Sequence, residues 1–325
     1  IIIIIYMQKK IIFILLMLFA SCNRLPESKG EFNEIVIISS DIDKKIYLDD
    51  VNQLLGGHIN TPSEESKYIL KWIDEDKFQY YLGYKNILFL NLTDPADSTI
   101  DNLVDKFRVT YDMDIFTLND VYAENQNLFI FSSDNYLDFK NDIAQHGDWI
   151  IDNIDEQINK SLSKYIYRNG NNEEIELLLN NHFNINSSIQ NDFLIVKDKL
   201  STDDFIWIGR GYPYRWLCFD RIENINELDL WEFFKLSVSE HMPNVVIKDY
   251  YKSISYESDN FIRIQGLYEE KQSDTGGPFI VYAKFNSLDK TALLVSGFVN
   301  NPGKPKIRLL KELEIQILNS LDGNR

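Results

Sequence analysis

The chain has 325 residues, a formal net charge of −17 and a composition that is 44% hydrophobic and 13% aromatic. This apolar fraction is sufficient for a packed core and excludes a disordered chain. Such an acidic surface repels phosphate polymers, so no nucleic-acid partner is expected.

The first patterned segment is a short apolar run behind two lysines. Nine uninterrupted apolar residues, 11–19, are followed by the small pair Ala20-Ser21. This order is typical of a secretory signal, and the run is shorter than the roughly 20 residues that a membrane-spanning helix needs. Residues 1–6 lie upstream of the expected start at Met7. The segment 1–21 is therefore predicted to be a signal peptide.

Cys22 directly follows this small pair. The arrangement resembles a bacterial lipobox, in which the signal is cut before a cysteine that is then acylated, although Phe19 stands where leucine is usual. Two or more acyl chains hold a protein stably on a membrane. Cys22 is thus the predicted lipid attachment site and 22–31 a polar tether. We expect the folded part to face the periplasm from the inner leaflet of the outer membrane. An ordinary secretory cleavage beside an incidental cysteine is the alternative.

Residues 32–168 are predicted to form an N-terminal α+β subdomain. Strands are expected where β-branched and apolar residues run together, and helices where apolar residues recur every three and four positions. The expected strands are Glu34–Ser39, Lys67–Ile73, Asn86–Leu92, Met113–Leu118 and Asn127–Phe131. The expected helices are Lys44–Leu55, Ser98–Lys106 and a long one that is capped by Ser133-Asp134 and extends through Tyr165.

The turn 169–172 marks the predicted domain boundary, and 172–325 is the predicted C-terminal α+β subdomain. Its expected helices are Glu173–His182, Leu230–His241 and one from near Pro305 to Leu321. Its expected strands are Asp192–Lys197, Phe205–Gly209, Trp216–Arg221, Phe261–Glu269, Pro278–Asn286 and Thr291–Asn300. After the first helix the order is β-β-β-α-β-β-β-α. Short turns between consecutive strands favour antiparallel pairing. The predicted fold class is α+β, with antiparallel sheets and helices packed on one face.

The sequence carries no recognisable catalytic motif. The patterns G-x-S-x-G, G-x-x-x-x-G-K, H-E-x-x-H and C-x-x-C are all absent. The four histidines are far apart, and none is paired at metal-ligand spacing: His58, His146, His182 and His241. Cys218 lies in an apolar run and is expected to be a buried, inert thiol. The sequence therefore predicts no catalytic residue, no metal and no cofactor.

Two segments combine residue types suited to contact with a ligand or partner. Trp207 and Arg210 stand near the end of one strand, and an aromatic ring flanked by arginine can form a ligand platform. Asp274, Gly276 and Gly277 lie in a turn whose glycines permit positive φ or a close backbone approach, which frees N–H groups for an anion or a peptide terminus. The structural interpretation is a core tryptophan, a solvated arginine and a simple hairpin turn.

Three cations open the last helix against its dipole, which favours negative charge there. They are Lys304, Lys306 and Arg308. Either acidic side chains lie nearby or the cations serve a ligand.

Several of these segments resemble a Bacteroidota lipoprotein family of unknown function, domain of unknown function 4837. The likeness covers nearly the whole chain after the signal. It is carried by Leu25–Gly30, Asn33–Ile37, Phe205–Arg210, Gln265–Tyr268, Gly276–Phe279 and Gly297–Glu314, with departures at Gly209, Gln265, Tyr268, Thr275 and Asn300. The resemblance implies an acylated Cys22. It implies no functional residue, because the family has no assigned activity.

Two hypotheses of function remain. The first is a non-catalytic binding or scaffolding module, lipid-anchored in the envelope, for an envelope protein or a small ligand. The alternative is a hydrolase or transferase that acts on envelope polymers through acidic residues. A carboxylate pair in a cleft would favour the enzyme, and an open groove or flat apolar patch would favour the binder.

Overall fold

The computed structural model describes residues 25–92, 98–111, 114–225, 229–258, 261–286, 288 and 290–321. The predicted signal peptide and Cys22 lie outside these residues. No helix in the described ranges is long and apolar enough to cross a membrane. The described residues form two compact units, one from those up to Ile46 and within Lys71–Phe139, the other from Tyr47–Leu70 and those from Lys140 onward. These units do not coincide with the segments 32–168 and 172–325.

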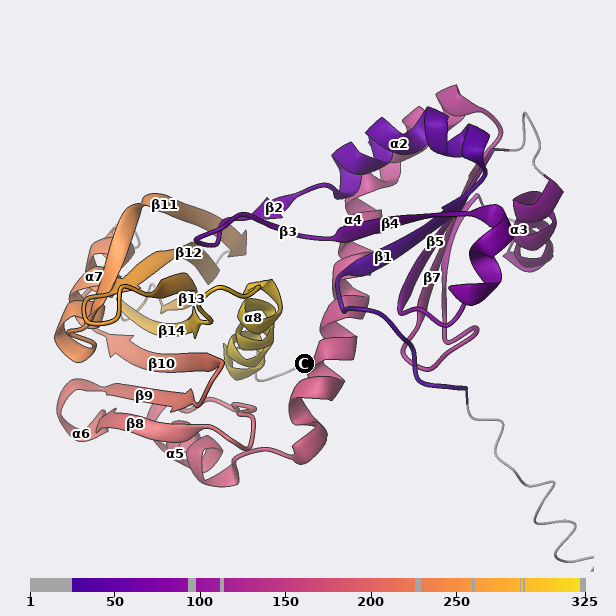
Figure 1. The fold of residues 1–325 in the computed structure, drawn as a ribbon. Coiled ribbons are helices and arrows are strands. Elements are labelled where there is room, and N and C mark those ends of the chain that lie inside the picture. Colours follow the sequence, from indigo (N-terminus) through magenta and orange to yellow (C-terminus); the bar gives the residue numbers. More distant parts are fainter. Residues whose placement is uncertain are drawn as a thin grey trace, which may run out of the picture. The chain divides into compact units, whose positions relative to one another are not determined.

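The first unit is built on a five-stranded sheet of order β4-β1-β5-β7-β6 (Figure 1). β1 pairs in parallel with β5, and β5 with β7, whereas β6 is antiparallel to β7. The expectation of an antiparallel sheet is wrong here. These parallel strands read as nearly continuous apolar runs, which is typical of strands buried on both faces. The strands are β1 (Glu34–Ser39), β4 (Ile69–Asp74), β5 (Asn86–Leu92), β6 (Ile115–Asn119) and β7 (Asn127–Ser133).

Helices and short elements complete this part of the chain. Ser40 caps the first helix, because its hydroxyl accepts a hydrogen bond from the Asp43 N–H at 3.0 Å. Ile100 and Val104 of α3 pack into the core against the sheet. The elements are α2 (Asp41–Leu55), β2 (His58–Ile59), β3 (Glu65–Ser66), η1 (Glu75–Tyr80), α3 (Ser98–Tyr111), α4 (Tyr136–Ile166) and η2 (Tyr167–Asn169).

The second unit contains a seven-stranded sheet of order β11-β12-β13-β14-β10-β9-β8. All neighbouring strands in it are antiparallel, as predicted. The strands are β8 (Leu194–Lys199), β9 (Phe205–Arg210), β10 (Tyr214–Ile222), β11 (Val245–Ser258), β12 (Phe261–Glu270), β13 (Gly276–Asn286) and β14 (Thr291–Asn300). Helix α7 (Leu230–His241) has the predicted bounds, but four strands follow it where three were expected. β11 was not predicted, because a register shift between Lys248 and Ser253 interrupts the period-two alternation of a strand.

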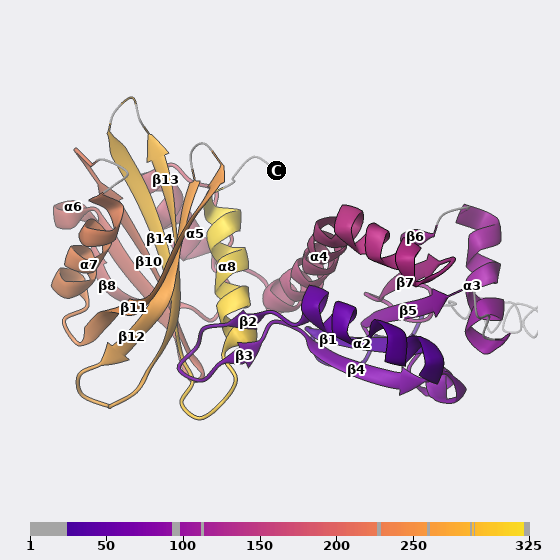
Figure 2. The ribbon, with the colours of Figure 1, turned by 90° about the horizontal axis from the view of Figure 1, so that it is seen from above.

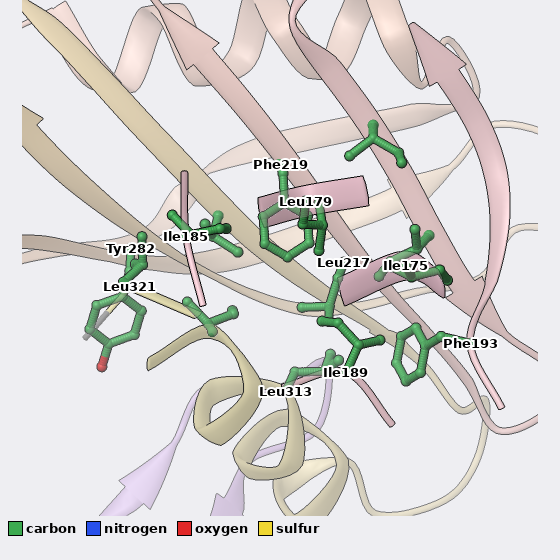
Figure 3. Close-up of a cluster of buried hydrophobic side chains, with 14 of the residues drawn as sticks. Ile175, Leu179, Ile185, Ile189, Phe193, Leu217, Phe219, Tyr282, Leu313 and Leu321 are labelled. Carbon is green, nitrogen blue, oxygen red and sulfur yellow. The ribbon is translucent and has the colours of Figure 1, made fainter. Parts of the chain in front are cut away.

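Helices cover both faces of this sheet, as Figure 2 shows, so the expectation of helices on one face is wrong. α5 (Glu173–Phe183) and α8 (Ile307–Leu321) pack on one face and α7 on the other. Neighbouring residues divide between the two cores: Ile206 joins the α5–α8 cluster of Figure 3, and Phe205 joins the α7 cluster. The sequence does contain a pattern that indicates a sheet covered on both faces. The run 279–283 is buried throughout, and a strand with one solvated face would alternate with polar residues.

Candidate functional site

An open groove of about 800 Å³ lies at one end of the seven-stranded sheet. Residues from β11, the β12–β13 turn and the loop before α8 line it. Asp274 and Gly276, two of the sequence-predicted residues, are among them. The other polar residues of the groove include Lys248, Lys271, Lys306, Glu269, Glu270, Tyr250, Tyr251 and Tyr268.

A bulge in β11 places two tyrosines on the groove. Residues 249–252 face Gly266 alone, between the register pairs that flank them. Tyr250 is 65% exposed and Tyr251 is 48% exposed, with ring centroids 4.9 Å apart. Adjacent exposed tyrosines offer apolar area together with hydroxyl groups, a combination that is common at binding surfaces.

Two carboxylates of the groove already have donors. Glu269 pairs with the Lys248 ammonium at 2.5 Å. Glu270 accepts hydrogen bonds from the Asn300 amide at 2.9 Å and from the Ser273 hydroxyl at 2.8 Å. These contacts tie the end of β12 to β11, to the end of β14 and to the turn that follows β12, and both carboxylates are engaged as acceptors.

Two ammonium groups of the groove have no carboxylate partner among the described residues. Lys271 donates to the Pro243 carbonyl at 2.8 Å, and Lys306 donates to the Lys304 carbonyl at 2.9 Å. Lys306 is only 4% exposed, and a buried charge without a counterion is unfavourable. The described lining holds three lysines and three carboxylates, so it is formally neutral, and Lys271 and Lys306 are its cations without a carboxylate partner.

Tyr268 brings a buried hydroxyl to the same groove. The residue is 1% exposed, and its ring packs against Trp216 and Phe298. The hydroxyl has no hydrogen-bond partner among the described residues, and burial raises its pKa. An unsatisfied buried hydroxyl costs about 1–3 kcal/mol. A ligand acceptor that reached this hydroxyl would recover part of that cost.

Glu65 of the β2–β3 hairpin caps the helix that borders the groove. Its carboxylate accepts hydrogen bonds from the N–H groups of Lys306 at 2.8 Å and Ile307 at 2.9 Å. Arg308, the third cation at this helix start, pairs with Glu312 at 3.0 Å. Acidic side chains therefore bind the backbone N–H groups at the helix start and the Arg308 guanidinium. The Lys306 ammonium has no such partner among the described residues and lines the groove.

The two glycines of the predicted turn are explained by close packing. A Cβ on Gly276 would lie 2.2 Å from the Tyr268 carbonyl oxygen, and one on Gly277 would lie 1.8 Å from that of Val299. Positive φ occurs in this turn at Asp274, where it is 47°, and at neither glycine. Both positions thus require glycine because the neighbouring strands approach too closely for a side chain.

Trp207 and Arg210 lie away from the groove. The Trp207 ring packs edge-on against Trp216, with centroids 5.5 Å apart, on the α7 side of the sheet. Strand register aligns Trp207 with a residue of β10, then one of β14, and finally with Val281 of β13. Val281 lies five residues, or about 17 Å, along β13 from Gly276. Arg210 lies on the opposite face of β9, because side chains alternate along a strand, and pairs with Asp192 at 2.6 Å. The structure therefore does not bring the five predicted residues into one site.

Cys218, in contrast, is as predicted. Its thiol is buried, and its sulfur lies 3.6 Å from that of Met242. Burial raises the pKa of this thiol, so it is held in the unreactive protonated form.

A second polar cluster, around His241, escaped the sequence reading. Ligand atoms of Asp203, Glu240 and His241 lie within 4.8 Å of one another. The buried carboxyl of Asp220 is nearby, and burial together with the charge of Glu240 raises its pKa to about 6. Asp203 is remote in sequence from the other two, so no spacing rule would have found the group.

Fold and groove define the class: an α+β protein whose larger sheet carries an open, tyrosine-lined groove at one end. Residues 238–320 match the family model described as Domain of unknown function (DUF4837). The match spans β11 to β14 and most of α8, and includes nearly all residues of the groove.

Among solved structures, the chain is similar to a mutant of the protein Mog1 and to the Ran-binding protein Mog1p of Saccharomyces cerevisiae. Each is 10% identical with a TM-score of 0.30. The likeness covers 42% and 43% of this chain, respectively, and 88% of each neighbour. It carries no argument about function. A comparison with curated protein sequences found no match.

Proposed function

We propose that the chain is a lipid-anchored protein of the bacterial envelope whose second unit is a non-catalytic binding module. Acylated Cys22 would hold it on the inner leaflet of the outer membrane, facing the periplasm. The order of lysines, apolar run and small residues before Cys22 supports the anchor. The match of residues 238–320 to the family model supports the resemblance to domain of unknown function 4837 over that segment.

The groove would bind an envelope protein through a carboxylate, either an acidic side chain or a chain terminus. The observation that carries this proposal is the set of donors at the groove. Lys306 and Lys271 lack carboxylate partners among the described residues, and the Tyr268 hydroxyl lacks any described partner. One carboxylate can accept hydrogen bonds from both ammonium and hydroxyl donors. Tyr250 and Tyr251 would add the apolar contact area.

The alternative of an envelope-polymer hydrolase or transferase has less support. Two of the groove carboxylates, Glu269 and Glu270, are engaged as acceptors. The carboxylates of Asp203 and Glu240 lie together, but they do not line the groove. Polymer turnover that disappears on Asp274→Asn would favour the enzyme.

Incorporation of labelled palmitate tests the anchor. The wild-type protein should take up label and stay with the membrane fraction, whereas Cys22→Ala should take up none. Equal labelling of the two proteins would exclude acylation at Cys22.

Site-specific photocrosslinking in cells tests the groove. A photoreactive amino acid in place of Tyr250 should give one discrete adduct with an envelope protein. The control places the same group at Tyr80, which is 82% exposed in the first unit. Adducts of equal yield and pattern at both positions would show general crowding and would contradict a binding groove.

A further inference from the structure

Three side chains with metal-binding atoms meet where α6 (Leu200–Asp203) and α7 end. Asp203, Glu240 and His241 each place one such atom within 4.8 Å of the others. An ion held at about 2.0–2.2 Å from each would bring these atoms to roughly 3.5 Å apart. Asp203 and Glu240 are exposed, so rotation of their side chains suffices to close the difference.

His241 is the rigid member of this group. The residue is 6% exposed, and its ring stacks on Phe205 with centroids 4.0 Å apart and 13° between the planes. The hydrogen bond at this residue goes to its backbone carbonyl, from Lys197 at 3.0 Å. Neither ring nitrogen has a hydrogen-bond partner among the described residues. The ring nitrogens are therefore available to a ligand, and a neutral imidazole is a common metal ligand.

The charge around His241 also favours a cation. Glu240 lies in the last turn of α7, where the negative end of the helix dipole disfavours an anion. Asp203 and Glu240 make no ion pair with any described residue. In addition to burial, the negative charges of Glu240, Asp203 and Asp204 all act on the carboxyl of Asp220 and raise its pKa. Lys197 and Lys199 oppose this field at His241, and the Lys197 ammonium donates to the His241 carbonyl.

We propose that Asp203, Glu240 and His241 bind a divalent transition-metal ion of the zinc class. One imidazole nitrogen and two carboxylate oxygens suit zinc, with water in the remaining position. The ion would tie the end of α6 to the end of α7. The site is separate from the groove, so the proposal stands independently of the proposed function.

Calorimetric titration with zinc tests the site. The full-length chain, purified in detergent and stripped with a chelator, should bind one equivalent of zinc and melt at a higher temperature when loaded. Asp203→Asn and Glu240→Gln should each weaken zinc binding by about tenfold or more, since even loss of an outer-shell partner costs 10–100-fold. X-ray absorption at the zinc edge should show nitrogen and oxygen neighbours.

Glu232→Gln is the matched control. Glu232 is exposed on the first turn of the same helix and pairs with Lys235 at 3.0 Å. Its substitution should leave zinc affinity unchanged. Absence of zinc binding overturns the proposal, as does binding that survives both Asp203→Asn and Glu240→Gln. These two exposed substitutions avoid the loss of folding that replacement of the buried His241 would risk.

Discussion

Asp220 is the residue whose titration should be visible in stability. Its carboxyl is 8% exposed on the α7 side of the sheet and accepts a hydrogen bond from the Ser237 hydroxyl. Burial raises the pKa of Asp220 to about 6, the Ser237 hydroxyl opposes the rise, and the charge of Glu240 adds to it. The folded state therefore holds this proton more tightly than the unfolded chain, in which the pKa of aspartate is about 3.9. This contribution to stability is full below pH ~4 and is lost as the pH rises through 6.

Asp220→Asn should remove that part of the pH dependence. The wild-type protein should lose about 2–3 kcal/mol of unfolding free energy from this group between pH 4 and pH 8, and the variant should not, because its amide is neutral throughout. The variant should then be the more stable protein at pH 8. Urea unfolding at both pH values, with chelator present, measures the difference. An equal change in unfolding free energy between pH 4 and pH 8 for the two proteins would show that Asp220 is ionised at little cost.

Gly277 makes a prediction about packing. Gly277→Ala should lower the unfolding free energy by about 2 kcal/mol or more, because the added Cβ would meet the Val299 carbonyl at 1.8 Å. Gly211→Ala is the control, since a Cβ there meets nothing within 4 Å and should change stability by less than about 0.5 kcal/mol. Urea unfolding of the two variants compares them. Similar small losses would mean that the strands relax around the extra methyl group.

At the scale of elements, the β2–β3 hairpin and α8 depend on each other through Glu65. Glu65→Gln should lower stability by about 1–2 kcal/mol, because a charged acceptor at a helix N-terminus becomes neutral. Glu64→Gln changes the neighbouring, exposed carboxylate and should have almost no effect. Thermal melting in low and high salt measures both. A loss that is equal in the two variants would contradict a specific cap.

The elements that sequence could predict are those with strong local patterns. Glu34–Ser39, Asn86–Leu92, Leu230–His241 and Thr291–Asn300 have the predicted bounds. Edge strand β11 and the two-residue strands β2 and β3 were missed, because a bulge and short length remove the alternation on which the reading depends. Which face each helix covers was also beyond the pattern, since it depends on the path between strands.

The site was only partly predictable for the same reason. The residue types of Asp274 and Gly276 predict a turn, and this turn lies at the groove. Lys306 does carry a local signal, as one of three cations that open the last helix against its dipole, whereas Tyr268 carries none. They meet at the groove because strand register and the start of α8 place them there. Trp207 appeared promising as a residue type, but the register sets it in a different part of the sheet.

At the scale of the whole molecule, the groove is formally neutral on a strongly acidic chain, with three lysines and three carboxylates among its described residues. The chain carries −17, yet two ammonium groups at the groove have no carboxylate partner among the described residues. A strongly acidic surface repels acidic partners elsewhere, so local cations would select where such a partner docks. An anchor at Cys22 would confine that encounter to the membrane.

The yield of the crosslink at position 250 after removal of the Lys306 charge tests the central claim most directly. Lys306→Met keeps the length of the side chain and should leave the melting temperature close to that of the wild type. The adduct with the envelope partner should fall about tenfold, which corresponds to loss of a hydrogen bond to a charged group. Lys304→Met is the control, because that exposed ammonium lies over the Tyr212 ring and does not line the groove. Equal adduct yield in both variants, with unchanged melting, would contradict recognition of a carboxylate by the groove.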